Sequence, residues 1–394
     1  MTSSYHLEDR GKCNKNTCTN TCNVPKLRFK GYNDEWKKVR TEEIFENVTI
    51  KNKPSLPVLA VTQERGTILR ESCGINIKYE NESLKSYKLV KPGNFIISLR
   101  SFQGGLEYSG LEGIVSPAYT ILNNKQSISY DFFKYYFKTY NFIKSLNIAV
   151  EGIRDGKQIS YNSFKDIKIT FPNIEEQEKI ASFLTLIDKK IEKQKELVEL
   201  LKKYKRGLLS AIFNQKLRFK DDNDNDYSAW EEKRLENILK IKHGKSQKEI
   251  ECNNGKYPIL ATGGEIGRTN SYLWDKPCVL IGRKGTIDKP QYMDTPFWTV
   301  DTLFYSEVFK ENNAKYLYYL FNTINWKKYD ESTGVPSLSA KTIERIKVTL
   351  SINYYEQLAI SKILSKFDDK IQQEEFILKK LQNYKKGLLQ QMFI

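Results

Sequence analysis

The chain has 394 residues, which is enough for two or more domains with hydrophobic cores of their own. Its 64 Lys and Arg residues against 48 Asp and Glu residues give a formal net charge of +16, and it has 24 Tyr and 20 Phe residues. This composition is typical of proteins that bind a polyanion, most often nucleic acid, although ribosome-associated and membrane-surface proteins share it. No apolar run approaches the roughly 20 residues of a membrane-spanning helix, and no signal-peptide pattern appears at the N-terminus, so a membrane or secreted protein is excluded and a cytoplasmic location is expected.

Residues 1–25 are expected to form a disordered leader, which is rich in Thr and Asn. Cys13, Cys18 and Cys22 lie within it, but a structural zinc site needs a fourth ligand, and His6 is the only nearby candidate. We therefore predict no metal site. The six cysteines of the chain show no closely spaced, even framework, as expected in a reducing compartment.

The first domain is predicted over residues 26–172. It opens with KLRFK at Lys26 to Lys30 and a Trp-led segment from Trp36, and it contains β-rich runs such as NFIISLR and IVSPAYTIL. The aromatic stretch DFFKYYFKTYNFIKSL looks like a helix that closes this domain. The pattern predicts a mixed α/β domain. Loops between its strands carry residues that could contact DNA bases or phosphates, namely Gln63, Arg65, Arg100, Gln103 and Lys157.

A long helix is predicted over residues 173–214. Asn173 followed by Glu176 resembles a capping box at its start. Beyond this cap, positions spaced four and three apart form a coiled-coil seam. A helix of about 39 residues extends roughly 58 Å. The seam consists of Ile180, Leu184, Ile187, Ile191, Gln194, Val198, Leu201, Lys205, Leu208 and Ile212.

The second domain is predicted over residues 215–352, and it opens in the same way as the first. KLRFK returns at Lys216 to Lys220, and a Trp-led segment begins at Trp230. PCVLIGR and TLFYSEVF are β-rich, and AKYLYYLFNTINWKKY matches the aromatic stretch of the first domain. The candidate DNA-contacting residues of this domain are Arg268, Arg283, Lys284, Lys289 and Gln291.

A second long helix, predicted over residues 353–394, begins with Asn353 and Glu356 in the same capping pattern. The seam of this helix has polar residues at the same two positions as the seam of the first helix. We expect the two helices to pair as an antiparallel coiled coil with the two domains at opposite ends; the alternative is that each helix packs only on its own domain. The seam consists of Ile360, Leu364, Phe367, Ile371, Glu374, Leu378, Leu381, Lys385, Leu388 and Met392.

The chain thus contains an internal repeat, which predicts a pseudo-two-fold arrangement of two similar lobes. Residues 53–150 and 242–335 occupy equivalent places but share little beyond a strand that ends in Arg100 or Arg283. A protein that keeps its frame and varies two surfaces is expected to recognise two different targets. A duplicated scaffold without functional symmetry is the alternative.

Features of a catalyst are scarce in the sequence. His6 and His243 are the only histidines, which leaves little capacity for histidine-based catalysis. The HGKS run at His243 resembles the end of a phosphate-binding loop, but Leu239 stands where that loop requires glycine. We predict a binding protein without catalytic residues. A stand-alone nuclease with paired recognition domains and a coiled-coil interaction protein are the other function classes.

The repeated KLRFK and Trp-led openings, the two variable regions, and the closing stretches EEQEKIASFLTLIDKKI and KKYKRGLL resemble the specificity subunit of a type I restriction-modification system. The resemblance extends from about Lys26 to Ile394 and leaves out the Cys-containing leader. It implies that each domain recognises one half of a split, asymmetric DNA target, while the helices set the gap and dock two modification subunits. Those partners would use S-adenosylmethionine to methylate adenine, and a restriction subunit would hydrolyse ATP, with Mg²⁺, and cut the DNA. The resemblance implies no cofactor bound by this chain.

Overall fold

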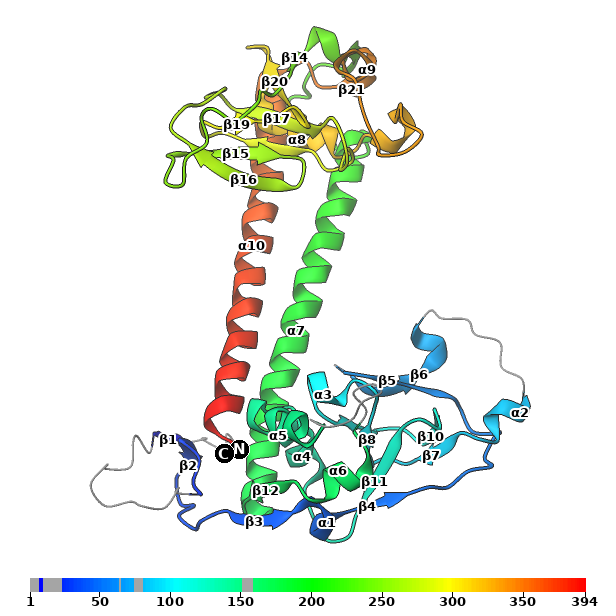
Figure 1. Cartoon of the computed structure of the whole chain (residues 1–394). Helices are drawn as coiled ribbons and strands as arrows, with labels where there is room; N and C mark the ends of the chain where they lie inside the picture. Colours follow the sequence, from blue (N-terminus) through cyan, green and yellow to red (C-terminus); the bar gives the residue numbers. More distant parts are fainter. Residues whose placement is uncertain (1–6, 10–22, 64, 74–80, 151–158) are drawn as a thin grey trace. The chain divides into compact units, whose positions relative to one another are not determined.

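The structure is a computed structural model that describes residues 7–9, 23–63, 65–73, 81–150 and 159–394 (Figure 1). His6, Cys13, Cys18, Cys22 and Lys157, which were considered from the sequence, lie outside these residues. Contacts divide the chain into two compact units. Unit 1 comprises Met1–Lys193 with Ile377–Ile394, and unit 2 comprises Gln194–Phe376.

Unit 1 is built on a four-stranded antiparallel sheet in the order β4-β11-β8-β9. Smaller antiparallel pairs join β5 to β6, β7 to β10 and β3 to β12. The strands are β1 (Leu7–Asp9), β2 (Leu27–Phe29), β3 (Lys37–Arg40), β4 (Phe45–Val48), β5 (Leu59–Thr62), β6 (Gly66–Leu69), β7 (Lys88–Val90), β8 (Phe95–Ile97), β9 (Glu107–Tyr108), β10 (Gly113–Val115), β11 (Thr120–Asn124) and β12 (Lys168–Phe171).

Helices on unit 1 pack an aromatic core against this sheet. Phe45 is fully buried, and its ring lies 5.4 Å from that of Phe133 and 5.7 Å from that of Phe95. Burial of each such side chain contributes about 1.5–3 kcal/mol to folding. The helices are α1 (Thr41–Ile44), the 3-10 helix η1 (Arg70–Cys73), α2 (Asn81–Leu84), α3 (Ser101–Gly104), α4 (Tyr130–Tyr136), α5 (Tyr140–Val150) and α6 (Tyr161–Lys165).

Unit 2 repeats the plan of unit 1. Its four-stranded sheet has the order β14-β20-β17-β18, β13 pairs with β21, and β15 pairs with β16 and, in parallel, with β19. The parallel β15–β19 contact matches the parallel bridge between Val58 and Ile114 in unit 1. The elements are β13 (Glu231–Arg234), η2 (Leu235–Asn237), β14 (Leu239–Lys242), β15 (Tyr257–Ala261), β16 (Gly264–Thr269), β17 (Cys278–Gly282), β18 (Gln291–Met293), β19 (Trp298–Thr299), β20 (Leu303–Val308), α8 (Ala314–Phe321), η3 (Trp326–Tyr329), α9 (Ala340–Arg345) and β21 (Lys347–Leu350).

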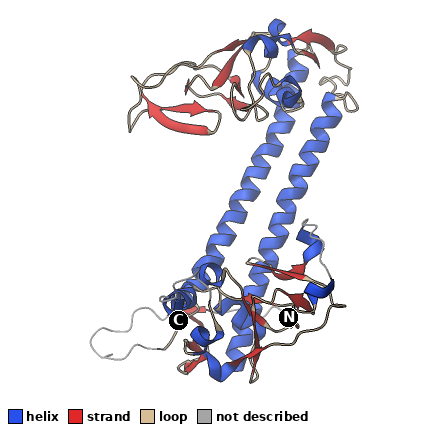
Figure 2. Cartoon of the chain, turned by 45° about the vertical axis from the view of Figure 1, so that its right-hand side comes forward, coloured by secondary structure: helices blue, strands red, loops and turns tan. Residues whose placement is uncertain are grey.

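The mixed α/β character predicted for both domains is confirmed, and Figure 2 shows strands and short helices within each unit. Two local expectations need correction. Each aromatic stretch forms two elements rather than one closing helix, because the chain turns at Phe137–Thr139 in unit 1 and at Asn322–Asn325 in unit 2. In addition, Leu7–Asp9 of the expected disordered leader pair with Leu27–Phe29 as strand β1.

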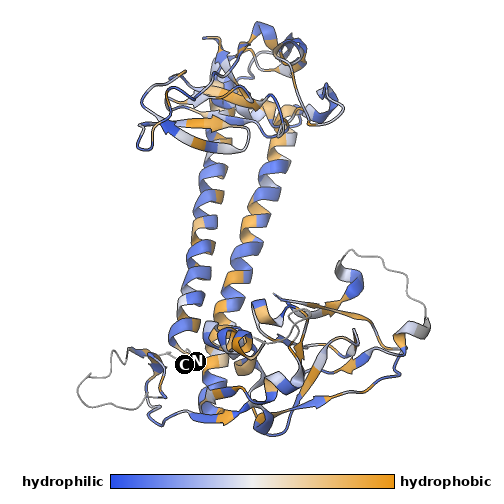
Figure 3. Cartoon of the chain, in the orientation of Figure 1, coloured by the Kyte–Doolittle hydropathy of each residue, from blue (hydrophilic) through white to orange (hydrophobic). Residues whose placement is uncertain are grey.

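The long helices α7 (Ile174–Phe213) and α10 (Tyr354–Gln391) each contribute residues to both units. Figure 3 shows apolar residues recurring along both helices among polar ones. The chain that follows α10 completes the core of unit 1, where the Phe393 ring lies 5.3 Å from that of Phe132. The last turn of α7 completes the core of unit 2, where the Phe213 ring lies 5.4 Å from that of Tyr316.

The prediction for the start of each long helix is correct for the asparagine cap but wrong for the capping box. The backbone N–H of Glu176 donates to the Asn173 side chain at 3.0 Å, and that of Glu356 donates to Asn353 at 3.3 Å, so both asparagines cap as predicted. The glutamate carboxylates, however, do not return to the caps to complete a capping box. They bind arginines from the KLRFK segments instead.

Candidate nucleic-acid interface

In unit 1, four of the five predicted DNA-contacting residues lie on two neighbouring loops. Gln63 and Arg65 belong to the turn between β5 and β6, whereas Arg100 and Gln103 lie just after β8, on and before α3. The Gln63 side-chain amide donates to the Arg100 carbonyl at 3.1 Å, which joins the two loops. All four residues are exposed. The fold therefore gathers them into one surface, although they are separated in the sequence.

In unit 2, Arg283 and Lys284 follow the equivalent central strand, β17. Thr262, in the turn between β15 and β16, lies against Gly282 and Gly285, so a hairpin turn again meets the loop after the central strand. The Arg283 guanidinium forms an ion pair with Asp301, and the Lys284 side chain is exposed. Lys289 and Gln291 lie further along, at the start of β18.

Arg268 of unit 2 is engaged in holding its own domain together. Its guanidinium donates to the carbonyls of Gly255 at 2.8 Å and Lys256 at 3.1 Å, and it pairs with Glu265 at 3.0 Å. These bonds fix the loop that precedes β15. Contact with DNA by Arg268 would require some of them to be exchanged.

The start of each long helix holds a buried ion pair that sequence reasoning missed. Arg28 donates to both carboxylate oxygens of Glu176, at 2.7 and 2.8 Å, and both residues are almost fully buried. In unit 2, Arg218 and the Trp230 indole N–H both donate to Glu356, at 3.0 Å each. The signal available in the sequence was the repetition of KLRFK together with the repeated Glu-Gln pair at each helix start.

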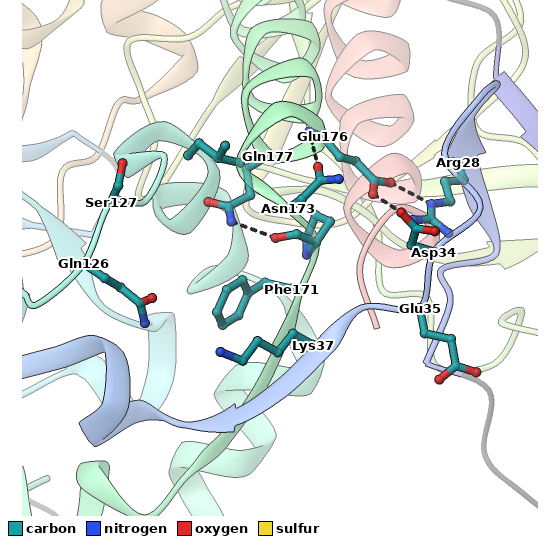
Figure 4. Close-up of a pocket in the computed structure, with 12 residues that line it drawn as sticks. Arg28, Asp34, Glu35, Lys37, Gln126, Ser127, Phe171, Asn173, Glu176 and Gln177 are labelled. Atoms are coloured by element: carbon teal, nitrogen blue, oxygen red, sulfur yellow. Dashed lines mark hydrogen bonds and ion pairs between the residues drawn. The ribbon is translucent and has the colours of Figure 1, made fainter.

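A pocket of about 330 Å³ lies beside the Arg28–Glu176 pair, as Figure 4 shows. Side chains of both charges line it, including Lys37 and Asp34. Gln177 closes one side, where its amide donates to the Pro172 carbonyl at 2.8 Å. Mixed charge at this place does not favour a phosphate group, so we do not assign this pocket to DNA binding.

Apolar residues of the predicted helix seam are buried to different degrees within the two units. In unit 1, Ile180, Leu184, Ile187 and Ile191 are buried in one cluster with Leu388, and Leu378 and Leu381 pack against it. In unit 2, Ile360 and Leu364 are buried in a cluster that includes Ile212. Other seam residues of unit 2 differ in burial, since Val198 is buried while Leu201, Phe367 and Ile371 are half-buried. The first residues of each seam therefore also pack on the helices of their own domain.

In unit 2, the polar seam residues of α7 bind side chains of α10. Gln194 donates to the Glu374 carboxylate at 2.6 Å, and Lys205 pairs with Asp368. Lysine and glutamine side chains beside Glu374 lower the pKa of its carboxyl group, because hydrogen bonds from Lys370 and Gln194 favour the charged form. From the Gln194–Glu374 contact to the Lys205–Asp368 contact, residue numbers rise along α7 while they fall along α10, so the two helices run antiparallel in unit 2.

One polar cluster recurs in both units. In unit 1, the Tyr135 hydroxyl donates to Asp188 at 2.8 Å, and Lys385 pairs with Asp188 at 2.5 Å. In unit 2, the Tyr319 hydroxyl donates to Asp368 at 2.6 Å, and Lys205 pairs with Asp368. Each cluster joins a short aromatic helix to both long helices. Burial is the main cause that raises the pKa of each tyrosine.

Within the described ranges, no group of three or more His, Cys, Asp and Glu residues could hold a metal ion. Every helix in the same part of the chain is too short or too polar to cross a membrane.

Comparison with known proteins identifies relatives of both units. The family model described as type I restriction modification DNA specificity domain matches residues 33–202 and again residues 227–383. The MjaIX type I restriction enzyme specificity subunit of Methanocaldococcus jannaschii is 30% identical over 188 residues, which cover 44% of this chain and 43% of that protein. The MjaVIII specificity subunit of the same organism is 24% identical over 355 residues, covering 76% of this chain and 78% of that protein.

Solved structures show the same fold. The type I restriction-modification S subunit from M. genitalium superposes with a TM-score of 0.60 at 19% identity and covers 94% of this chain and 99% of its own. A chain from a structure of type I R-M complex assembly and conformational transition gives a TM-score of 0.56 at 13% identity, with 91% and 97% covered. The resemblance inferred from the repeats is confirmed: because the family model matches twice and spans most of the chain, this protein belongs to the type I restriction modification DNA specificity domain family.

Proposed function

We propose that this chain is the DNA-recognition subunit of a type I restriction-modification complex, in which each unit recognises one half of a split, asymmetric target. The observation that carries the proposal is the pair of equivalent surfaces. Each is built from a hairpin turn and the loop after a central strand, and each presents different polar side chains. Unit 1 offers Gln63, Arg100 and Gln103, whereas unit 2 offers Arg283 and Lys284.

The chemistry of these side chains suits the reading of base edges. Arginine can donate two hydrogen bonds to guanine, and glutamine can form two with adenine, one through its amide NH2 group and one through its amide oxygen. Lysines and the remaining arginines would contact phosphates, which supply most of the affinity, and the net charge of +16 favours that contact. Different side chains on equivalent surfaces imply two different half-sites.

The long helices would form an antiparallel coiled coil that sets the gap between the half-sites and docks two modification subunits. The exchange of partners supports a pseudo-two-fold relation, because α7 supplies Asp188 and α10 supplies Lys385 in unit 1, whereas α10 supplies Asp368 and α7 supplies Lys205 in unit 2. Gln194 and Glu374 meet near the middle of both helices. A symmetric frame of this kind presents two similar surfaces to two copies of a partner.

Catalysis would reside in the partners. The modification subunits would bind S-adenosylmethionine and methylate adenine, and a restriction subunit would use ATP and Mg²⁺, so this chain would bind no cofactor and act in the cytoplasm. Alone, it should neither methylate nor cleave DNA. Addition of modification subunits should restore methylation at the target.

The decisive experiment maps methylated adenines across the genome in cells with and without this chain. A chimera in which residues 53–150 are replaced by the equivalent part of a related protein should change one half of the target and leave the other half and the gap intact. Replacement of residues 242–335 is the matched control and should change only the other half. If either chimera altered both halves, independent recognition by the two units would be wrong.

A further inference from the structure

The two candidate DNA-reading loops of unit 1 are fastened together by close packing as well as by the Gln63–Arg100 hydrogen bond. A Cβ atom on Gly104 would lie 2.8 Å from the side-chain amide of Gln63, so a larger residue there would displace that side chain. Gly105 has φ +76°, and a Cβ there would lie 1.8 Å from the Phe137 carbonyl oxygen. The end of α3 is thereby brought against both the β5–β6 turn and the chain between α4 and α5.

Lys138, in the connection between α4 and α5, lies directly beneath this junction. Its ammonium group donates to the Gln63 carbonyl at 3.2 Å, to the Gly104 carbonyl at 3.0 Å and to the Glu107 carboxylate at 2.5 Å. An ammonium group has three donors, so every donor is used. One of its acceptors belongs to the hairpin turn, one to α3 and one to β9, so a single side chain connects all three segments.

The burial of this ion pair is costly for the fold. Glu107 is 2% exposed and the Lys138 side chain is 25% exposed. Burial lowers the pKa of Lys138, and burial raises the pKa of Glu107, while the mutual attraction of the two groups opposes both shifts. Apolar residues of similar shape commonly stabilise a fold as well as such an ion pair does. The Lys138–Glu107 pair therefore fixes the relative positions of the three segments rather than adding stability.

Unit 2 holds its equivalent loop in a different way. The backbone N–H of Gly285 donates to the Pro336 carbonyl at 2.8 Å, and that of Leu338 donates to the Arg283 carbonyl at 2.9 Å. Main-chain bonds to a neighbouring loop therefore fix the position of Arg283, whereas unit 1 relies on a side chain. Substitution of Lys138 should consequently act on one unit alone.

We propose that Lys138 is a positioning residue for target selection by unit 1. It aligns the β5–β6 turn with α3, so that Gln63, Arg100 and Gln103 meet the bases in one arrangement. This inference rests on the proposed function. Loss of the bridge should relax base selectivity at one half-site while leaving DNA affinity and the other half-site unchanged, because the base-contacting side chains themselves remain.

The test compares five variants in the complex reconstituted with modification subunits. Methylation rates are measured on the cognate target and on targets with single base changes in each half. Lys138→Met should lower selectivity at one half by about tenfold, which lies within the range expected for the loss of one well-placed bidentate contact. Lys144→Met, the removal of an exposed lysine on α5, is the matched control for loss of charge and should leave selectivity within about twofold of the parent.

Two further variants separate positioning from fold stability. Lys138→Met with Glu107→Leu removes both buried charges, so stability should recover while selectivity stays low. Glu107→Gln keeps an acceptor for Lys138 and preserves its bonds to Gln63 and Gly104, so selectivity should be retained. If selectivity recovered along with stability in the double variant, or fell in Glu107→Gln as it does in Lys138→Met, the positioning role would be refuted.

Arg100→Ala separates failure of this inference from failure of the proposed function. If Arg100→Ala changes selectivity at one half and Lys138→Met in a folded complex does not, the positioning role of Lys138 is wrong and DNA reading by unit 1 stands. If neither substitution changes selectivity, the surface assigned to unit 1 does not read DNA, and both proposals fall together.

Discussion

The arginine of each KLRFK segment binds the glutamate at the start of a long helix, but the two sites differ in the partners and the water available to the arginine. Arg28 is 2% exposed and binds Glu176 alone, and its Nη1 atom, like Nε1 of Trp36, has no hydrogen-bond partner among the described residues. The side chain of Arg218 is 28% exposed and also donates to the carbonyls of Tyr227 and Ser228.

The same arginine–glutamate pair is therefore present in both units, but unit 1 depends on it more than unit 2 does. In unit 1, the removal of one carboxylate leaves a buried guanidinium without a partner. In unit 2, solvent and main-chain carbonyls remain available to the same group. The two units should therefore respond unequally to equivalent substitutions.

The largest expected effect comes from Glu176→Ala. This change leaves Arg28 as an uncompensated buried charge and should lower the free energy of unfolding of unit 1 by about 3–5 kcal/mol. Glu356→Ala should cost unit 2 less, about 1–3 kcal/mol, which reflects mainly the Trp230 indole N–H left without a partner. Hydrogen exchange resolved by segment measures each unit separately.

Glu231→Ala is the control for these two variants, because its exposed ion pair with Lys233 should contribute less than about 1 kcal/mol. An equal loss in both units, or a larger loss in unit 2, would contradict the distinction between the two sites.

The surfaces proposed to contact DNA give the next largest effect. Arg100→Ala and Arg283→Ala should each reduce discrimination at one half-site, by about 1–3 kcal/mol if the arginine contacts a base edge. The two arginines differ in the absence of DNA, because Arg283 must give up its ion pair with Asp301 before it contacts DNA. Methylation rates on targets altered in either half measure the effect, and a change in both halves from one substitution would break the assignment of one unit to one half.

The recurring tyrosine–aspartate–lysine cluster is the feature in which the two units agree, so its substitutions should have matching effects. Tyr135→Phe and Tyr319→Phe each remove one hydrogen bond to a charged, partly exposed aspartate, which is worth about 1.5 kcal/mol. Thermal unfolding of both variants, followed by segment-resolved hydrogen exchange, checks this. A difference of more than about 1 kcal/mol between them would show that the equivalence of the clusters is only geometric.

Much of the architecture could be predicted because it follows from local patterns. The apolar spacing from Ile180 predicted a long helix at 173–214, and α7 occupies Ile174–Phe213. Short β-rich runs such as VLIG correspond to β17. The turn at Phe137–Thr139 was missed because it interrupts an aromatic run whose composition does not change there.

The candidate site was only partly predictable, since side-chain type identifies possible DNA contacts but not the groups that position them. Lys138 binds partners that lie 75, 34 and 31 residues away, and no sequence pattern records such distances. Glu176 was assigned to a capping box for the same reason, because its true partner, Arg28, lies 148 residues away. Long-range polar contacts of this kind depend on the tertiary fold, which local propensity does not encode.

Cys278 can report on the opening of unit 2 alone. This thiol is fully buried on β17, and burial raises its pKa to about 12 from the usual 9. Below pH 9 the neutral thiol adds its full contribution to stability, and that contribution is lost as the pH rises from about 9 towards 12. At pH 8, alkylation of Cys278 therefore requires local opening of unit 2. Its rate, measured by mass spectrometry, should rise roughly tenfold to 100-fold in Glu356→Ala and stay within about twofold of the parent in Glu176→Ala. If the alkylation rate rose equally in both variants, the two units would open together. Loss of either arginine–glutamate pair would then destabilise both units, which contradicts the distinction between them.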